Sequence, residues 1–324
     1  MYCSEETLDD LLNDVLLELI ELPCEITASR GTFSEVFGVL LKLTNPRARI
    51  SRTETKGKPF SALGELLWYL SKDNRLDFIT HYLKRYEKDS EDGETIWGGY
   101  GPRIFNLHNK YDQLQCVIDL LRRNPSTRRA VIQIFDASDI AAEHREIPCT
   151  CTIQFAIRNN ELNMFTSMRS NDAFIGLPHD IFAFTMLQEL LARTLNVDLG
   201  TYSHSVASLH LYAKDRKQAI EYLNEGFQST KINMPEMPMG DPWNAIKTVL
   251  QAEVEIRNSK FVDADKLGLE QYWTNLIYLL QIHFHLDKGQ LEEVEKLKKK
   301  INYPMYDTYI EKRLNKKVEA EKAK

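Results

Sequence analysis

The feature that most restricts the fold is a long, largely apolar segment over residues 178–195, which predicts a buried helix. Segments with the character of strands flank it in the sequence. Three strands are predicted upstream, over residues 130–135, 152–157 and 162–168, and strand-like alternation returns over residues 202–212. A buried helix among strands predicts an α+β protein.

Further helices are expected before this region. Apolar residues recur at helical spacing over residues 4–22, where Ser4 can cap the first turn, and again over residues 61–71. A third helix is predicted over residues 113–123. The highly charged segment 84–95 is expected to form a surface loop between these helices.

The chain changes character after residue 242, where predicted strands give way to helices. Three helices are expected there, over residues 243–258, 265–286 and 289–301. The lysine-rich tail after Lys312 is expected to fray. We therefore predict a main domain over residues 1–242 and a helical C-terminal extension over residues 243–324.

Composition excludes several classes of protein. The 324 residues are 43% hydrophobic, which is enough for a large core, and the net charge of -6 argues against nonspecific binding to nucleic acid. Five cysteines without framework or zinc-ligand spacing predict reduced thiols and no structural metal. We see neither a basic signal-peptide region nor an apolar run of membrane-spanning length, so we expect a cytoplasmic protein without a membrane partner.

Cys149 is the first residue that could carry chemistry. It follows a proline at the start of a predicted strand. A cysteine thiolate attacks soft electrophilic carbons once its pKa is lowered. Taken alone, a buried structural cysteine fits the same pattern, because free cysteines are commonly buried.

Arginines that could hold a phosphate group occur in two places. Arg128 and Arg129 form a pair after a turn signal, and Arg169 is followed by Ser170. Guanidinium groups and hydroxyls suit phosphate oxygens. Ordinary surface charge explains any one of these arginines equally well.

Three other polar residues lie on predicted regular structure. Glu65 falls on the mainly apolar helix of residues 61–71, where it could face solvent or act in proton transfer through water in a cleft. His210 and Tyr212 alternate on a strand, so both face the same side. They could hydrogen-bond a sugar hydroxyl or form an ordinary half-buried pair.

Taken in order, these segments resemble the thymidylate synthase family between Arg30 and Tyr212. The similar segments are residues 30–32 (RGT), 64–70 (GELLWYL), 96–101 (IWGGYG), 124–129 (NPSTRR), 148–149 (PC), 169–172 (RSND), 176–181 (GLPHDI) and 209–212 (LHLY). The resemblance implies an α+β, thymidylate synthase-like fold with a central mixed β-sheet packed by helices. It also implies a pyrimidine nucleoside monophosphate as substrate and 5,10-methylenetetrahydrofolate as co-substrate, with no metal.

The resemblance further implies a role for each matching residue in a catalytic domain over residues 1–242. The catalytic residues would be Cys149, Glu65, Tyr100 and Asp180. The nucleotide would be bound by Arg30, Arg128, Arg129, Arg169, Ser170, Asp180, His210 and Tyr212. Arg128 and Arg129 would reach the partner's site in a homodimer. The folate would be contacted by Trp97, Asp172 and Gly176.

One departure from the family bears on the substrate. The family usually has Phe-Asn where this chain has His179-Asp180. An asparagine amide donates and accepts, as a uracil edge requires, whereas an ionised carboxylate only accepts and suits the amino group at N4 of cytosine. Asp180, together with Asn171 and Thr150, resembles the deoxycytidylate hydroxymethylase branch. We therefore predict folate-dependent C5 hydroxymethylation of dCMP or CMP.

Two alternatives stay open at this point. The first is a thymidylate synthase or deoxyuridylate hydroxymethylase acting on dUMP, in which a neutral Asp180 donates to O4. The second is a nucleotide-binding protein without catalytic activity. Thr150 replaces the histidine usual in synthases, and helices follow where synthases end in a short apolar tail.

Overall fold

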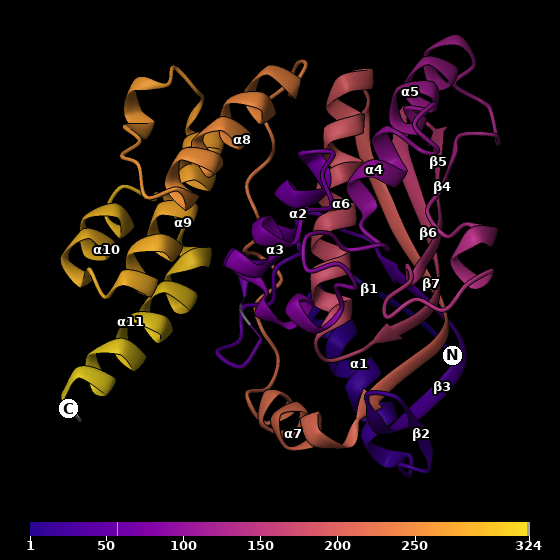
Figure 1. Cartoon of the computed structure of the whole chain (residues 1–324), viewed down its shortest axis with the longest axis horizontal. Coiled ribbons are helices and arrows are strands. Elements are labelled where there is room, and N and C mark those ends of the chain that lie inside the picture. Colours follow the sequence, from indigo (N-terminus) through magenta and orange to yellow (C-terminus); the bar gives the residue numbers. More distant parts are fainter. Residues whose placement is uncertain (57, 323–324) are drawn as a thin grey trace.

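The computed structural model describes residues 1–56 and 58–322, so residue 57 of the predicted main domain and residues 323–324 of the predicted extension lie outside the described residues. Within the described ranges, the frame is a seven-stranded sheet packed on one face by helices (Figure 1). This arrangement confirms the predicted α+β class. The helices α8 to α11 form a separate layer on the far side of that packing.

The sheet is mixed. Its order is β1-β3-β7-β6-β5-β4, with β2 paired to β3, and its strands are β1 (Tyr2–Glu5), β2 (Ile26–Ala28), β3 (Gly31–Leu43), β4 (Val131–Gln133), β5 (Thr150–Arg158), β6 (Glu161–Asp172) and β7 (Asp198–Tyr212). β1 runs parallel to β3 and β6 runs parallel to β7, whereas the remaining pairs are antiparallel.

α6 (Gly176–Leu195) is the buried helix that the sequence predicts. The other helices of the main domain are α1 (Leu8–Glu21), α2 (Pro59–Leu70), α3 (Leu76–Tyr82), α4 (Tyr100–Phe105), α5 (Gln113–Arg123) and α7 (Arg216–Asn224). α6 packs against α2 and α5 as well as against β6 and β7. Because α6 is apolar on most sides, it can pack against the sheet and against α2 at once. The first turn of α6 therefore lies beside α2.

The first helix begins later than predicted. Its cap is Thr7, whose side-chain oxygen accepts a hydrogen bond from the backbone of Asp10 at 3.1 Å. Ser4, the expected cap, lies in β1 and pairs with Lys42 of β3. The prediction was wrong because parallel pairing with a distant strand outweighs the local helical pattern.

The C-terminal region is helical, with α8 (Trp243–Arg257), α9 (Gln271–Lys288), α10 (Leu291–Lys298) and α11 (Asp307–Lys322). The predicted fraying after Lys312 was wrong for residues 313–322, because α11 continues to Lys322, whereas residues 323–324 lie outside the described residues. Tyr309 and Ile310 are buried, and Arg313 pairs with Asp287 of α9 at 3.0 Å. These contacts hold the last helix against its neighbours.

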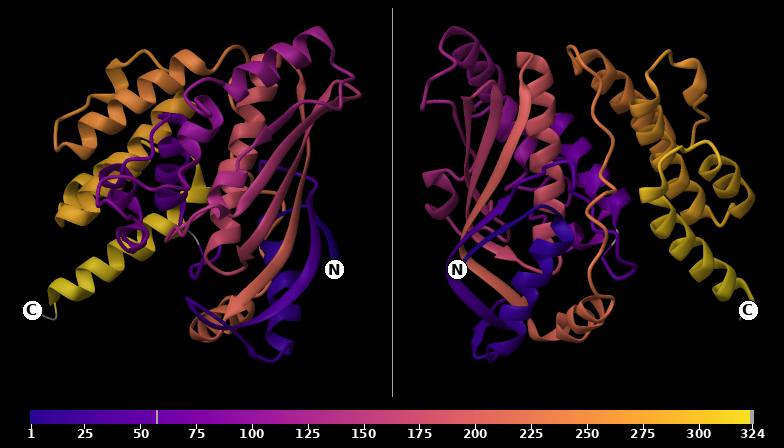
Figure 2. Two further views of the ribbon diagram at one scale, coloured as in Figure 1. Left: turned by 45° about the vertical axis from the view of Figure 1, so that its right-hand side comes forward. Right: turned by 180° about the vertical axis from the view of Figure 1, so that it is seen from behind.

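The C-terminal helices pack on the back of α2 and α3 (Figure 2). The hydroxyl of Tyr82, at the end of α3, donates to Glu253 of α8 at 2.9 Å. The His283 ring of α9 stacks on Phe60 and Tyr82, with centroid distances of 5.8 and 5.3 Å. A Cβ at Gly64 of α2 would lie 2.2 Å from Cγ of Tyr82, so only glycine lets α3 approach this closely.

Candidate functional site

A cavity of about 360 Å³ opens where α2, the first turn of α6 and the ends of β5, β6 and β7 converge. Most of the predicted site residues line it: Arg30, Glu65, Tyr100, Cys149, Arg169, Ser170, Asp172, Gly176, Asp180, His210 and Tyr212. These residues come from segments far apart in the chain. The fold therefore brings into one cavity side chains whose order along the chain was all that the sequence showed.

Three predicted residues lie outside this cavity. Arg128 and Arg129 are exposed just before β4. Trp97 lines a second cavity of about 500 Å³ and stacks on His144, which lines the first, at a centroid distance of 4.0 Å and an angle of 11°. The Trp97–His144 stack therefore lies between the two cavities.

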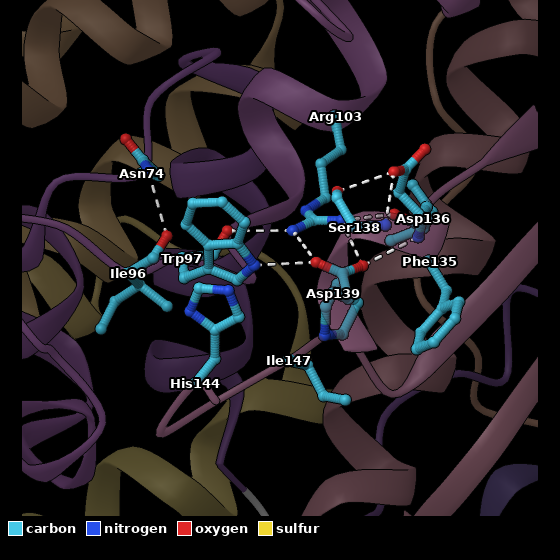
Figure 3. A network of polar contacts seen from close by, with 12 residues as sticks. Asn74, Ile96, Trp97, Arg103, Phe135, Asp136, Ser138, Asp139, His144 and Ile147 are labelled. Carbon is cyan, nitrogen blue, oxygen red and sulfur yellow. Dashed lines mark hydrogen bonds and ion pairs between the residues drawn. The ribbon is translucent and has the colours of Figure 1, made fainter. Parts of the chain in front are cut away.

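A buried polar network fixes Trp97 (Figure 3). Its indole nitrogen donates to Asp139 at 2.8 Å, and the same carboxylate accepts from Arg103 at 2.6 and 2.8 Å. Burial raises the pKa of Asp139, but hydrogen bonds from Arg103, the Asp136 backbone and Trp97 outweigh it and hold that pKa below its usual value. Asp139 therefore stays ionised and keeps the indole in place.

The loop before β5 presents Cys149. Arg169 of β6 donates through Nε to the carbonyl of Pro148 at 2.9 Å and through a terminal nitrogen to that of Ile147, also at 2.9 Å. Burial raises the pKa of Cys149 to about 11, with Arg169 opposing the shift and Asp180 adding to it. The thiol is therefore protonated near neutral pH, and a nucleophilic role requires that its proton be removed.

Tyr100 lies beside this cysteine. Its hydroxyl donates to Thr150 at 2.9 Å and accepts from the Thr150 backbone at 3.2 Å. Its ring stacks on Tyr69 at 4.9 Å. Burial raises the pKa of Tyr100, so the hydroxyl keeps its proton. Thr150 thus occupies a defined position next to Cys149.

Glu65 is buried in the cavity wall and does not face solvent. It accepts a hydrogen bond from Tyr86 at 2.8 Å, and Arg85 lies 4.0 Å away. Tyr86 and Arg85 belong to the segment that the sequence predicts as a surface loop. A short 3-10 helix, Lys84–Lys88, instead folds over α2. The only feature of the sequence that could have indicated the contact with Glu65 is the presence of Tyr86 among charged residues.

Asp180 lies near the N-terminal end of α6 and lines the cavity. It accepts a hydrogen bond from the Asn171 amide at 2.6 Å. Burial raises the pKa of Asp180 to about 7, and the charge of Glu65 adds to this shift. The neighbouring His179 is held by Ser61 at 2.9 Å, and burial lowers the pKa of His179 to about 3, so it is neutral.

The other end of the cavity carries Arg30, which pairs with Asp89 at 2.8 Å. His210 and Tyr212 lie nearby on β7, with ring centroids 4.9 Å apart. Both side chains are on one side of the strand, as predicted. This end combines an exposed cation with hydrogen-bonding rings, which suits a phosphorylated sugar.

Asp172 and Gly176 shape the cavity between these two ends. One oxygen of Asp172 accepts from the backbones of Phe174 and Ile175 at 2.8 and 3.0 Å. A Cβ at residue 176 would approach the Asn171 amide to 3.2 Å, so glycine keeps this part of the cavity open.

Two wider features bear on function. Among residues 1–56 and 58–322, no group of His, Cys, Asp and Glu side chains is arranged to hold a metal ion. In the same part of the chain, every helix is too short or too polar to span a bilayer.

The thymidylate synthase family model matches residues 31–267, so the chain belongs to the thymidylate synthase family. Two similar proteins are both named deoxyuridylate hydroxymethyltransferase. The protein of Bacillus phage SP01 is 30% identical over 64% of this chain and 56% of its own length. That of Delftia phage PhiW-14 is 32% identical over 57% of this chain and 55% of its own length. The chain thus spans about half the length of these curated relatives.

Proposed function

We propose that this protein transfers a one-carbon unit from 5,10-methylenetetrahydrofolate to C5 of a pyrimidine nucleoside monophosphate, giving a hydroxymethyl group. The observation that carries the proposal is the meeting of Cys149, Glu65 and Asp180 in one cavity. A nucleophile, a carboxylate for proton transfer and a group that contacts the base are the parts that this reaction needs. Membership of the family and the names of the two relatives support the same reaction class.

In this proposal the nucleotide phosphate binds Arg30, Arg169 and Ser170, and the sugar binds His210 and Tyr212. Arg30 would exchange its contact with Asp89 for the phosphate. Two oxygens of a phosphate group match the forked geometry of a guanidinium. The base then lies over Cys149 and Asp180.

Cys149 would add to C6 of the pyrimidine, and this makes C5 nucleophilic. Covalent addition divides one difficult step into easier ones. When bound, the folate supplies a one-carbon unit at the oxidation level of formaldehyde, and Asp172, Gly176 and Trp97 would hold it. Water ordered by Glu65 would accept the C5 proton, and the protonated Tyr100 hydroxyl would take part in this transfer as a hydrogen-bonding partner.

We propose cytosine as the base. Asp180 is half-buried in the cavity wall beside the Asn171 amide. Its ionised form offers only acceptors, which suits the amino group at N4. Both dCMP and CMP remain within this proposal.

A uracil nucleotide such as dUMP is the second proposed substrate, on two observations. Both named relatives are deoxyuridylate hydroxymethyltransferases. The pKa of Asp180 is raised to about 7, so a large share of molecules carry the neutral acid near neutral pH. That acid can donate to O4 of uracil.

The test is to incubate the purified protein with the folate and, separately, with dCMP, CMP, dUMP and UMP. Mass spectrometry of the nucleotides then gives the product. A cytosine nucleotide that gains the mass of a hydroxymethyl group supports the proposal. Product from uracil nucleotides alone supports the second substrate, and a methyl product excludes water attack. Nucleotide binding without any product would indicate a non-catalytic nucleotide-binding protein.

We also propose a homodimer in which Arg128 and Arg129 reach the partner's cavity. Both arginines are exposed and lie outside the cavity of their own chain. Val131 and Phe165 flank the same β5 residue in adjacent strands, and each is 40% exposed on the sheet surface. Apolar side chains exposed together on a sheet favour burial against another subunit.

The dimer proposal predicts complementation between two inactive variants. Arg128→Ala and Cys149→Ser proteins, when mixed and allowed to exchange subunits, should form hybrid dimers with one intact cavity. The other cavity of each hybrid carries both defects. About a quarter of wild-type activity should therefore return after random exchange of equal amounts, and at most about a half if every dimer is a hybrid. Each variant alone is the control. Absence of recovery after verified subunit exchange would contradict a shared site.

We propose that residues 1–242 form the catalytic domain and that residues 243–324 extend it. The extension contacts α2 through the stacking of His283 on Phe60, and it contacts α3 through the Tyr82–Glu253 hydrogen bond. Glu65 lies on the front of α2. In this proposal the extension helps to fix the position of Glu65.

A further inference from the structure

Five carboxylates line the cavity: Glu65, Asp89, Glu146, Asp172 and Asp180. Four of them accept a hydrogen bond from the protein, namely Glu65 from Tyr86, Asp89 from Arg30, Asp172 from the Phe174 backbone and Asp180 from Asn171. Glu146 differs, because its Oε2 is buried without a donor among the described residues. Such an atom is costly to bury unless something entering the cavity donates to it.

The position of Glu146 is fixed from both sides. The preceding residue, Arg145, donates through its backbone to Glu91 at 2.8 Å and through its side chain to the carbonyl of Ser90 at 2.7 Å. The carbonyl of the following residue, Ile147, accepts from Arg169. Glu146 is therefore held on a short loop only three residues before Cys149.

The direction of the side chain is fixed as well. A Cβ at Gly98 would lie 2.1 Å from Oε2 of Glu146 and 2.9 Å from Cδ. The carboxylate thus rests directly on the glycine backbone, and both residues line the cavity. Gly98 follows Trp97, which is expected to contact the folate. Glu146 consequently lies on the loop that carries the nucleophile and contacts the residue next to the predicted folate contact.

The surroundings make Glu146 a stronger base than a free glutamate. Burial raises its pKa and Asp89 adds to the shift, whereas Arg30, Arg169 and Arg103 oppose it. Its charge also contributes to the raised pKa of Cys149, so the two groups interact across the cavity. A base whose pKa is nearer to neutral transfers protons more effectively at physiological pH.

We propose that Glu146 is the base that activates the water molecule forming the hydroxymethyl group. This role rests on the proposed function. After C5 has received the one-carbon unit, lost its proton and released tetrahydrofolate by cleavage of the bond from the one-carbon unit to the folate nitrogen, the pyrimidine carries an exocyclic methylene group. Water oxygen bonds to that carbon, and the water proton moves to the Glu146 carboxylate. The electron pair of the methylene double bond shifts into the ring and expels the Cys149 thiolate from C6, which restores the C5–C6 double bond.

This assignment separates two proton transfers that a single carboxylate would otherwise perform. Glu65, which already accepts from Tyr86, serves removal of the C5 proton in the proposed mechanism. Glu146 serves the later step and has a free oxygen for a water molecule. A chain without a carboxylate at this position would lack a base beside the methylene group, so the residue also bears on the choice of product.

The test uses the full-length Glu146→Gln variant, whose amide keeps the shape that rests on Gly98. Glu143→Gln, an exposed change on the same loop, is the matched control. Two quantities are measured with the nucleotide that the wild-type protein accepts. Exchange of the C5 hydrogen with solvent deuterium, without folate, reports on Cys149 addition. Product formation with folate is then followed with and without 2-mercaptoethanol, whose thiolate attacks the methylene group without a protein base.

We expect the variant to retain C5 exchange and to form the hydroxymethyl product about 100-fold more slowly, in line with the loss of a general base. The thioether product formed with 2-mercaptoethanol should increase at the same time. Equal hydroxymethyl rates in variant, control and wild type would overturn the role. Loss of C5 exchange in the variant would also overturn it, because Glu146 would then act earlier. A wild-type protein without C5 exchange or product would instead refute the proposed function itself.

Discussion

The base preference of this protein should change with pH, because Asp180 titrates inside the cavity. Burial raises its pKa to about 7. Below that pH the neutral acid can donate to O4 of uracil, and above it the carboxylate only accepts and suits N4 of cytosine. The ratio of kcat/KM for dCMP to that for dUMP is therefore expected to rise as the pH increases through 7.

The size of the change follows from the titration. Each pH unit changes the ratio of ionised to neutral Asp180 about tenfold, so the preference should change by up to roughly 100-fold between about pH 6 and pH 8. A hydrogen bond to a charged group contributes about 1.5–3 kcal/mol, a factor of roughly 10 to 150, which is enough to support such discrimination. His179, with its pKa lowered to about 3, stays neutral over this range and adds no titration of its own.

Asp180→Asn separates this explanation from others. The amide donates and accepts but does not titrate, so the ratio should become independent of pH and move toward the uracil nucleotide. Because burial raises the pKa of Asp180, its contribution to stability is complete below pH 3.8 and is lost as the pH rises through about 7. The variant should therefore be more stable than wild type above pH 7, by up to about 4 kcal/mol, with little difference at pH 4.

The assay is kcat/KM for both nucleotides across this pH range, with urea unfolding of the same two proteins. A wild-type ratio that does not change with pH would refute the titration of Asp180 as the source of base preference. So would an Asp180→Asn protein with the same pH-dependent ratio as wild type.

Two further predictions concern packing. Gly64→Ala places a Cβ 2.2 Å from Cγ of Tyr82 and should lower the free energy of unfolding by about 1–3 kcal/mol, yet cost almost nothing in a Tyr82→Ala background, as urea unfolding would show. Asp139→Asn leaves the buried Arg103 without its carboxylate and should cost about 3–5 kcal/mol, whereas the exposed change Asp119→Asn should be near neutral in the same measurement. Equal stability of the two Asp variants would contradict a structural role for the network.

Local sequence patterns were sufficient to predict the helices and strands that are determined by neighbouring residues in the chain. The observed bounds of α5, Gln113–Arg123, match the prediction, because Asp112 caps the first turn and accepts from Gln115. The buried α6 and the strands β4 to β7 were also predicted. Each has a continuous periodic pattern that few other structures could satisfy.

The strands β1 and β3 were not predicted. β1 has only four residues and depends on parallel pairing with β3, which is not visible in the local sequence. The alternation of β3 is interrupted at Gly38, whose φ of 77° requires a glycine. The alternating pattern therefore did not predict β3, because this strand is irregular.

For the cavity, the order of motifs predicted most of the lining residues. It did not predict Tyr86 against Glu65, because the charged segment 84–95 folds back over α2 only in three dimensions. Glu146 was also missed, since its environment depends on the approach of Gly98. The roles of Arg128 and Arg129 stay predictions.

The pairing of β3 with β7 joins strands from opposite ends of the cavity-forming region, with Phe33 opposite Tyr212. Ends so far apart close a large loop, and contacts of this kind form late and slow folding. The cavity therefore exists only once the chain has almost finished folding. A nucleotide at one hundred times its Kd would raise the free energy of unfolding by about 2.7 kcal/mol. It would not change the rates of the folding steps that precede formation of the cavity.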